Sequence, residues 1–292
     1  MLLRSPLTSL TAVLVLAGCS AGPVASPEPS SSSPAASGSA SASTGTSPSP
    51  TASTGTPTVV PAAPKRWACY RLSTAQLTRP TNASTPVSCR ARHTAQTIHV
   101  GLLDTVVDGH AVAVDSATVQ RQLSTTCPRK LAAYLGGSAT ARDLSRFHVV
   151  WYSPTLEQSD RGADWFRCDV IAFAGKDRLA TLPGTRRLRG VLGRSGALDD
   201  YGLCGTSAPG DAGFERVICG RRHSWRAVDT IPLPGGPRYP GTARVREAGD
   251  ADCKDLARAR SRDTLRFRYG WEWPTRQQWK RGQRFGYCWV PG

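Results

Sequence analysis

One pattern occurs twice in this chain, as WYSPTLEQSDRGADWFRCDV at residues 151–170 and as WEWPTRQQWKRGQRFGYCWV at residues 271–290. The two stretches align without a gap at a constant offset of 120 residues, and eight of their 20 positions are identical. The identities pair Trp151, Pro154, Thr155, Gln158, Arg161, Gly162, Cys168 and Val170 with Trp271, Pro274, Thr275, Gln278, Arg281, Gly282, Cys288 and Val290. Agreement of this density in so short a window indicates an internal duplication.

The apolar pattern around each copy predicts antiparallel strands. Apolar and polar side chains alternate over residues 265–273, which is typical of a strand with one buried face, and residues 147–152 are the counterpart in the first copy. Two earlier segments, 87–103 and 214–231, are also apolar enough to form strands. Each copy is therefore expected to contain a few short strands that pair with one another.

A helix is expected between the early and late strands of the first copy. Apolar residues recur every four positions from Val119 to Leu131, directly after Asp115-Ser116, which is typical of a capped helix. Pro128 falls inside this segment and is expected to break the helix near its middle. We therefore predict an α+β fold of two tandem small disulfide-stapled domains, each with a few antiparallel strands and one or two helices, after a disordered N-terminal stalk.

The first residues have the order of a bacterial export signal. Arg4 precedes an apolar run at residues 10–16, which is too short to cross a bilayer as a helix. The ending Leu16-Ala17-Gly18-Cys19 resembles the lipobox of bacterial lipoproteins, in which the cysteine is acylated after cleavage. We therefore expect a signal peptide at 1–18 and a lipid anchor at Cys19 on the extracytoplasmic face of the cell membrane. Ordinary secretory cleavage would leave an unpaired thiol, and the odd count of nine cysteines argues against it.

Residues 19–64 are expected to form a disordered linker. Apart from its cysteine, this segment is almost wholly Ser, Thr, Ala, Pro and Gly, with Glu28 as its only charge. It cannot bury enough apolar area to offset its ordering entropy, and a flexible coil of its length would span roughly 35 to 40 Å. Beyond it we expect a first repeat at 65–176, a basic linker at 177–196 and a second repeat at 197–292.

The eight remaining cysteines extend the duplication over both repeats. Their gaps are 20, 38 and 41 residues in the first set and 15, 34 and 35 in the second. An even set in an exported chain predicts disulfides rather than free thiols. Four cysteines in each repeat allow three pairings, and the sequence does not choose among them. We favour the pairings Cys69 with Cys89, Cys127 with Cys168, Cys204 with Cys219, and Cys253 with Cys288.

At these landmarks the chain resembles the septum-formation domain family of actinobacterial lipoproteins and membrane proteins. The second repeat keeps that family's closing segment as Pro274, Trp279, Gly282, Arg284 and Cys288. The first repeat departs from it, with Ser159 and Asp164 where the tryptophan and arginine stand, and Arg92 and Arg222 occupy a position where the family often has proline. The resemblance implies a link to cell division or envelope growth and carries over no catalytic residue.

Metal binding is an alternative role for the two Cys-x3-His segments that end at His93 and His223. Zinc usually takes four ligands from cysteine, histidine or carboxylate groups. The even pairing of the cysteines and the lack of a Cys-x2-Cys knuckle favour hydrogen-bonded structural histidines instead. We therefore expect no metal and no cofactor.

Catalysis is not expected either. The segment Gly193-Arg194-Ser195-Gly196 does not fit the Gly-x-Ser-x-Gly turn of a nucleophilic serine, and Asp199 and Asp200 are typical of solvated surface groups. An enzyme acting on cell-wall material is the alternative. It predicts a cleft in which His93 or His223 meets a carboxylate and a hydroxyl.

Charge is the remaining functional signal. The chain has 37 Lys and Arg against 21 Asp and Glu, a net charge of +16. Outside a membrane the abundant polyanions are wall phosphate polymers and lipid head groups, which a basic surface attracts over long range. We expect no nucleic-acid partner there. The alternative is that the arginines only decorate a solvated face.

Tryptophan and arginine together are common anchors of interfaces. A binding face in the second repeat is therefore expected if Trp279 and Trp289 lie on the surface, and the candidate binding residues are His93, His223, Trp279, Arg281 and Arg284. The sequence thus predicts a non-catalytic binding or adaptor protein of septum formation or cell-envelope assembly. Its expected partners are the lipid bilayer, through acylated Cys19, and divisome proteins, cell-wall proteins or anionic wall polymers.

Overall fold

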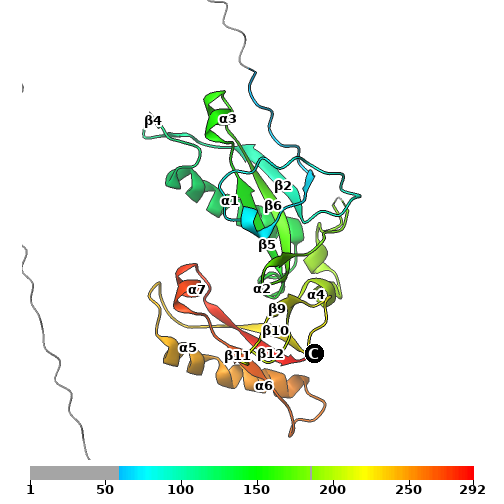
Figure 1. The fold of residues 1–292 in the computed structure, drawn as a ribbon. Coiled ribbons are helices and arrows are strands. Elements are labelled where there is room, and N and C mark those ends of the chain that lie inside the picture. The colour runs from blue at the N-terminus through cyan, green and yellow to red at the C-terminus, as the bar shows by residue number, and fades with distance from the viewer. Residues whose placement is uncertain (1–58, 185) are drawn as a thin grey trace, which may run out of the picture. The chain divides into compact units, whose positions relative to one another are not determined.

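The computed structural model describes residues 59–184 and 186–292 (Figure 1). The signal peptide expected at 1–18, Cys19 and most of the linker expected at 19–64 lie outside the described residues. All described residues belong to one compact unit. Among them there is no helix with the length and apolar character needed to cross a membrane.

Two antiparallel sheets have the same strand order. The first sheet runs β1 (Cys69–Tyr70), β2 (Ala95–Leu102), β6 (Trp165–Gly175) and β5 (Phe147–Tyr152), with β7 (Arg178–Leu179) beside β6. The second runs β8 (Leu203–Gly205), β10 (Trp225–Pro232), β12 (Phe285–Pro291) and β11 (Gly270–Glu272), with β9 (Arg216–Ile218) beside β8. The α+β class is as predicted, and the shared order agrees with a duplication.

The strand register repeats as well. A β-bulge falls between Thr97 and His99 on β2, and another falls between Ala227 and Asp229 on β10. These pairs of positions are equivalent, because β2 and β10 have the same length and pair with β6 and β12 in the same way. A bulge changes the direction of the side chains around it. Its recurrence at the equivalent position indicates that the two repeats are copies with the same backbone structure.

Helix α1 (Ala117–Leu135) covers the first sheet, and the prediction that Pro128 would break it was wrong. The helix begins at Ser116, whose hydroxyl accepts a hydrogen bond from the backbone N–H of Val119. Pro128 is exposed, and so is Ser124, four residues earlier. The carbonyl that loses its N–H donor therefore stays within reach of water, which lowers the cost of a proline inside a helix.

The strand predicted over residues 265–273 was also too long, because only Gly270–Glu272 pairs with β12. Leu265 is 91% exposed. The carboxylate of Asp263 accepts hydrogen bonds from the backbone N–H groups of Leu265 and Arg266, and this local turn replaces ladder pairing. The counterpart strand in the first repeat, Phe147–Tyr152, forms as predicted.

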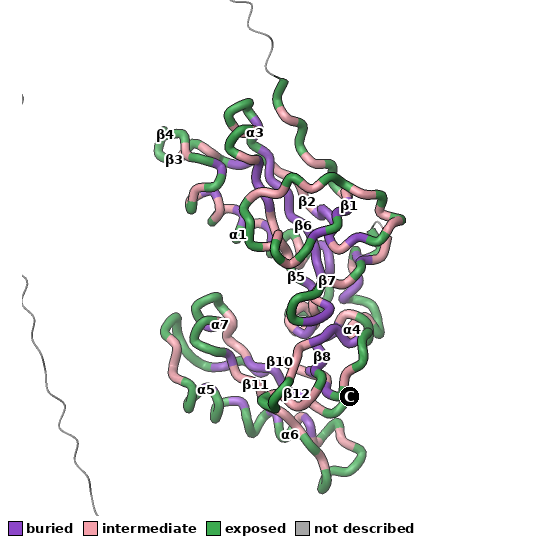
Figure 2. The backbone as a smooth tube through the Cα atoms, viewed as in Figure 1, coloured by how far each residue is buried: buried purple, intermediate pink, exposed green. Residues whose placement is uncertain are grey.

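The remaining elements are short. They are η1 (Thr74–Gln76), β3 (Val106–Val107), β4 (His110–Ala111), α2 (Ala139–Asp143), α3 (Leu156–Asp160), η2 (Val191–Gly193), α4 (Ala197–Tyr201), α5 (Thr242–Ala248), α6 (Asp250–Arg260) and α7 (Arg276–Lys280). Figure 2 shows that buried backbone follows the central strands of both sheets. Within the segment expected as a basic linker, 177–196, the side chains of Leu182, Leu188, Val191 and Leu192 are buried in the first core.

Four disulfides staple the two repeats, and they confirm the favoured pairings. In each repeat one bridge joins a helix to the sheet, Cys127 to Cys168 and Cys253 to Cys288. The other bridge lies at the early strands, Cys69 to Cys89 and Cys204 to Cys219. Each bridge stabilises the fold by about 2 to 4 kcal/mol, largely by restricting the unfolded chain.

Candidate functional site

Backbone hydrogen bonds join the two repeats at the points where β5 and β8 begin. The N–H of Leu203 donates to the carbonyl of Leu144 at 2.7 Å, and the N–H of Arg146 donates to the carbonyl of Tyr201 at 2.8 Å. These bonds form a β-bridge between the first and second repeats. The joint fixes strands from both repeats beside each other and so positions the side chains that follow it.

A cleft of about 600 Å³ lies beside this joint and is lined by both repeats. The first repeat contributes residues of α1, α2 and β5, and the second contributes residues of β8, β9, α7, β12 and the turn before β12. Its described lining contains four arginines, which are Arg142, Arg146, Arg216 and Arg281, and one acid, Asp143. We call this feature the arginine cleft.

Neutral backbone groups, rather than acids, hold two of the four arginines. Arg146 donates from Nε to the carbonyl of Phe173 at 3.1 Å and from Nη2 to the carbonyl of Arg216 at 3.4 Å. Arg142 donates from Nη1 to the carbonyl of Gly137 at 2.6 Å. Burial, followed by the charge of Arg216, lowers the pKa of Arg146 to about 10, so this guanidinium remains charged at neutral pH. The carbonyls orient the two cations without cancelling their charge.

The other two arginines differ in their pairing. Arg216 bonds to a carboxylate oxygen of Glu272 at 2.6 Å, and its guanidinium lies 5.2 Å from the centre of the Tyr287 ring. Arg281 is exposed, and its side chain forms no hydrogen bond or ion pair with the described residues. The described lining thus has four guanidinium groups and one carboxylate, that of Asp143, while Glu272 and Glu215 lie nearby. The cleft carries an excess of positive charge.

His148 on β5 is the titratable histidine of the cleft. Its side chain is exposed to the solvent of the cleft, and its ring meets that of Phe173 edge-on at 5.0 Å. Desolvation of the ring by the surrounding protein, followed by the charges of Arg146 and Arg216, lowers the pKa of His148. The imidazole is therefore neutral at pH 7 and can gain a proton when an anion offsets the arginines.

The arrangement suits binding better than acid–base catalysis. Ser145 and Asp143 also line the cleft, but within the described part of the chain no hydrogen bond joins either of them to His148. The Ser145 hydroxyl is buried and donates to the carbonyl of Arg142 at 2.8 Å. A nucleophile needs a base within hydrogen-bond reach, and these side chains do not form such a pair. Several arginines without matching acids instead favour a carboxylate or phosphate group.

The two predicted histidine sites lie away from the cleft. Nδ1 of His93 is 2.9 Å from the carbonyl of Ala91, and Nδ1 of His223 is 2.7 Å from the carbonyl of Arg221. Each contact requires the proton on Nδ1, so both histidines are hydrogen-bonded to the backbone of their own segment. The preceding cysteines are in disulfides and have no thiolate to offer a metal.

The predicted surface tryptophans are core residues, which corrects the expected Trp–Arg binding face. Trp279 and Trp289 are both fully buried. The indole of Trp279 donates to the carbonyl of Gly236 at 3.2 Å, and the Arg284 guanidinium lies 4.3 Å from the centre of the Trp279 ring. Arg284 also donates to the carbonyl of Trp279. Of the five predicted binding residues, only Arg281 lines the cleft.

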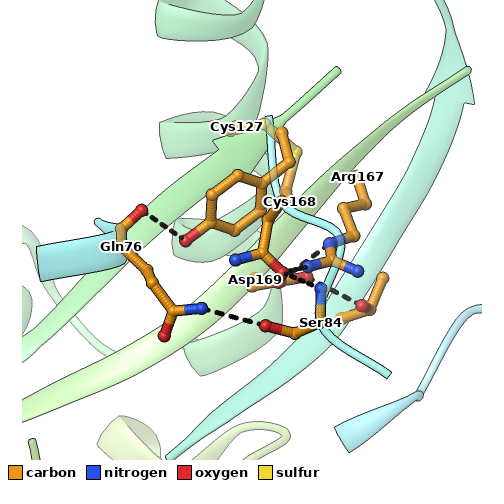
Figure 3. Close-up of polar contacts among 9 residues, drawn as sticks. Gln76, Ser84, Cys127, Arg167, Cys168 and Asp169 are labelled. Atoms are coloured by element: carbon orange, nitrogen blue, oxygen red, sulfur yellow. Dashed lines mark hydrogen bonds and ion pairs between the residues drawn. A yellow bond between two sulfur atoms is a disulfide. The ribbon is translucent and has the colours of Figure 1, made fainter. Parts of the chain in front are cut away.

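A second group of charges is closed to ligands. Figure 3 shows Arg167 beside Asp169, close to the disulfide that joins α1 to β6. Their N–O distance is 3.1 Å and both side chains are buried. The Thr97 hydroxyl donates to Asp169 at 2.7 Å, Arg167 donates to the Asn82 amide oxygen at 3.0 Å, and its guanidinium lies 3.8 Å from the centre of the Tyr70 ring. This network is a structural element of the first core.

Sequence reasoning missed four residues of the cleft, which are Arg142, Arg146, His148 and Arg216. They come from different repeats and from segments without a shared motif. The backbone joint near Leu144 and Leu203, together with contacts such as that of Arg146 with the carbonyl of Arg216, brings them together. The sequence contains no signal that could have assigned them to one site.

Comparisons with known proteins place this fold in a functional context. The protein family described as "Septum formation" matches residues 42–144 and 68–288. The matched ranges include the first repeat, the second repeat as far as Cys288 and every described residue of the arginine cleft. The search of curated proteins and the search of solved structures found no match.

Proposed function

Because the chain belongs to the septum-formation family, we propose that it is an extracytoplasmic, lipid-anchored binding protein of septum formation or cell-envelope assembly. Family membership links it to cell division or the envelope. The lipobox-like segment that ends at Cys19 supports the anchor, and the eight cysteines in disulfides suit an oxidising compartment. The anchor would keep the two repeats at the membrane on which a septum forms.

The arginine cleft is the observation on which the binding role rests. Backbone carbonyls orient Arg142 and Arg146, and the side chain of Arg281 has no acidic partner among the described residues. Such an excess of oriented cations recognises an anionic group on a wall polymer or on a partner protein. Within the described lining of the cleft, Ser145 and Asp143 form no hydrogen bond with His148, which favours a role in holding the partner over a role in cleaving it.

Complementation of a deletion strain tests this role. The wild-type gene should restore septum placement, whereas Arg216→Gln combined with Arg281→Gln should not, because it removes two of the cleft's cations. The matched control is Arg244→Gln combined with Arg246→Gln on α5, which removes the same charge from an exposed surface away from the cleft. Normal septa in the cleft variant would show that the cleft is not the binding site.

Two further measurements separate the anchor from the cleft. Cys19→Ser should release the protein from the membrane fraction, while the folded part keeps its four disulfides. Wall fractions should retain the wild-type protein at low salt and lose it at high salt, because exposed charges are screened within about 8 to 10 Å at physiological ionic strength. Retention that is independent of salt would contradict an electrostatic site.

A further inference from the structure

The loop between α6 and β11, residues 261–269, holds an apolar side chain out in solvent. We call it the Leu265 loop. Leu265 is 91% exposed, the most of any large apolar residue in the described ranges. The loop is nevertheless ordered by its own hydrogen bonds, since the Asp263 carboxylate accepts from Leu265 and Arg266 and the Ser261 hydroxyl donates to the Asp263 carbonyl at 2.8 Å. These hydrogen bonds fix the backbone of the turn in a conformation that leaves Leu265 exposed.

A pocket of about 290 Å³ adjoins the loop and combines cations with apolar surface. Arg260, Arg266 and Arg268 line it together with four apolar side chains, which are Ala257, Phe267, Val290 and Pro291. The arginine cleft also has apolar residues on its lining, but the exposed Leu265 adjoins this second pocket. Three cations beside apolar side chains match an amphiphilic ligand, which has an anionic head group and an apolar chain.

Nearby acids offset only part of the charge of these arginines. Arg260 lies 3.8 Å from a carboxylate oxygen of Asp229, and the Arg268 guanidinium is 5.6 Å from the centre of the Trp225 ring. The side chain of Arg266 has no hydrogen bond or ion pair with the described residues. Arg262 and Asp263 are both exposed on the same loop, and their charges offset each other. An acidic surface facing the loop would therefore be attracted to it.

We propose that the Leu265 loop and its pocket dock the second repeat on a bilayer that contains anionic phospholipid. The pocket arginines contact head-group phosphates, and Leu265 enters the boundary between the head groups and the acyl chains. This contact is additional to the anchor at Cys19, and it rests on the proposed function only in placing the protein at a membrane. Each arginine that reaches an anionic surface strengthens docking about fivefold, and salt weakens its effect.

Hydrogen exchange on the full-length protein tests the docking. The protein is reconstituted in vesicles of phosphatidylcholine alone or of phosphatidylcholine mixed with phosphatidylglycerol, and amide exchange in residues 261–269 is followed by mass spectrometry. Exchange in the loop should be slower on the anionic vesicles, whereas residues 156–160 of α3 should exchange equally on both. Flotation with neutral vesicles reports the Cys19 anchor separately, so its loss would refute the anchor and leave the loop measurement interpretable.

Variants then distinguish lipid docking from general charge. Arg266→Gln should reduce the protection about fivefold, and Leu265→Ser should reduce it at low and at high salt. Arg244→Gln on α5 is the matched control and should have no effect. Equal protection on neutral and anionic vesicles, or an equal loss in Arg244→Gln, would overturn the proposal. Removal of the protection by inorganic phosphate, with Leu265→Ser behaving as wild type, would identify a site for free phosphate and also overturn it.

Discussion

Binding of an anion in the arginine cleft should raise the pKa of His148. A sphere of about 600 Å³ has a radius of about 5 Å, so one negative charge at its centre would interact with a protonated His148 by about 0.8 kcal/mol in water and about 3 kcal/mol at an effective dielectric of about 20. Since His148 contacts the solvent of the cleft, the lower part of this range applies. We therefore expect a rise of roughly 0.5 to 1 pKa unit for each bound charge.

The sign follows from the groups that face the ring. Desolvation of the ring, followed by the charges of Arg146 and Arg216, holds the pKa of His148 below its ordinary value, and Asp143 is the acid on the lining. An anion offsets the arginines and favours the imidazolium. By linkage, the anion binds more tightly as the pH falls through the pKa of His148 in the complex.

An NMR titration of the histidine ring protons, with and without inorganic phosphate at constant ionic strength, measures this shift. His110 on β4 is exposed and does not line the cleft, so it serves as the internal control. The shift at His148 should shrink in Arg281→Gln and should be absent at His110. An unchanged His148, or an equal shift at His110, would refute the assignment of the cleft as an anion site.

Three further predictions concern stability, each measured by urea unfolding. Asp169→Ala should destabilise the protein by about 3 to 5 kcal/mol because it leaves Arg167 buried without its partner. Arg167→Met combined with Asp169→Leu should be close to neutral. An Asp169→Ala variant as stable as the wild type would contradict this. Replacing Cys253 and Cys288 with alanine should cost about 4 kcal/mol, from a loop of 35 residues, and an unchanged midpoint would contradict it. Pro128→Ala should stabilise α1 by about 1 to 3 kcal/mol, because it restores an N–H donor in the helix, and a loss of stability would show that the helix depends on the proline.

The repeat was predictable because its two copies align without a gap and their cysteines have similar gaps. The disulfide pairing was favoured but not fixed, because each set of four cysteines allows three pairings. The strand at 147–152 was predictable from its apolar residues, whereas the alternation over 265–273 was misleading. A single carboxylate, that of Asp263, turns the backbone there, and a periodicity argument takes no account of such local bonds.

The site was much less predictable than the fold. Trp279 lies in α7, a helix of five residues, which is too short for its apolar pattern to define a buried face. The cleft depends on how two repeats join, and Arg146 and Arg216 lie 70 residues apart without a common motif. Arg281 was chosen for a surface beside exposed tryptophans, but the structure places it on the lining of the cleft, while the tryptophans are buried.

The backbone joint between the repeats also affects how quickly a ligand can exchange. Opening the cleft by swinging one repeat away would break the bonds from Leu203 to Leu144 and from Arg146 to Tyr201. A preformed site avoids the cost of ordering its walls at each encounter, and positive charge speeds the approach of anions. An anion could then enter the cleft without first separating the repeats, so its rate of association would be limited by its approach and not by a slow opening step.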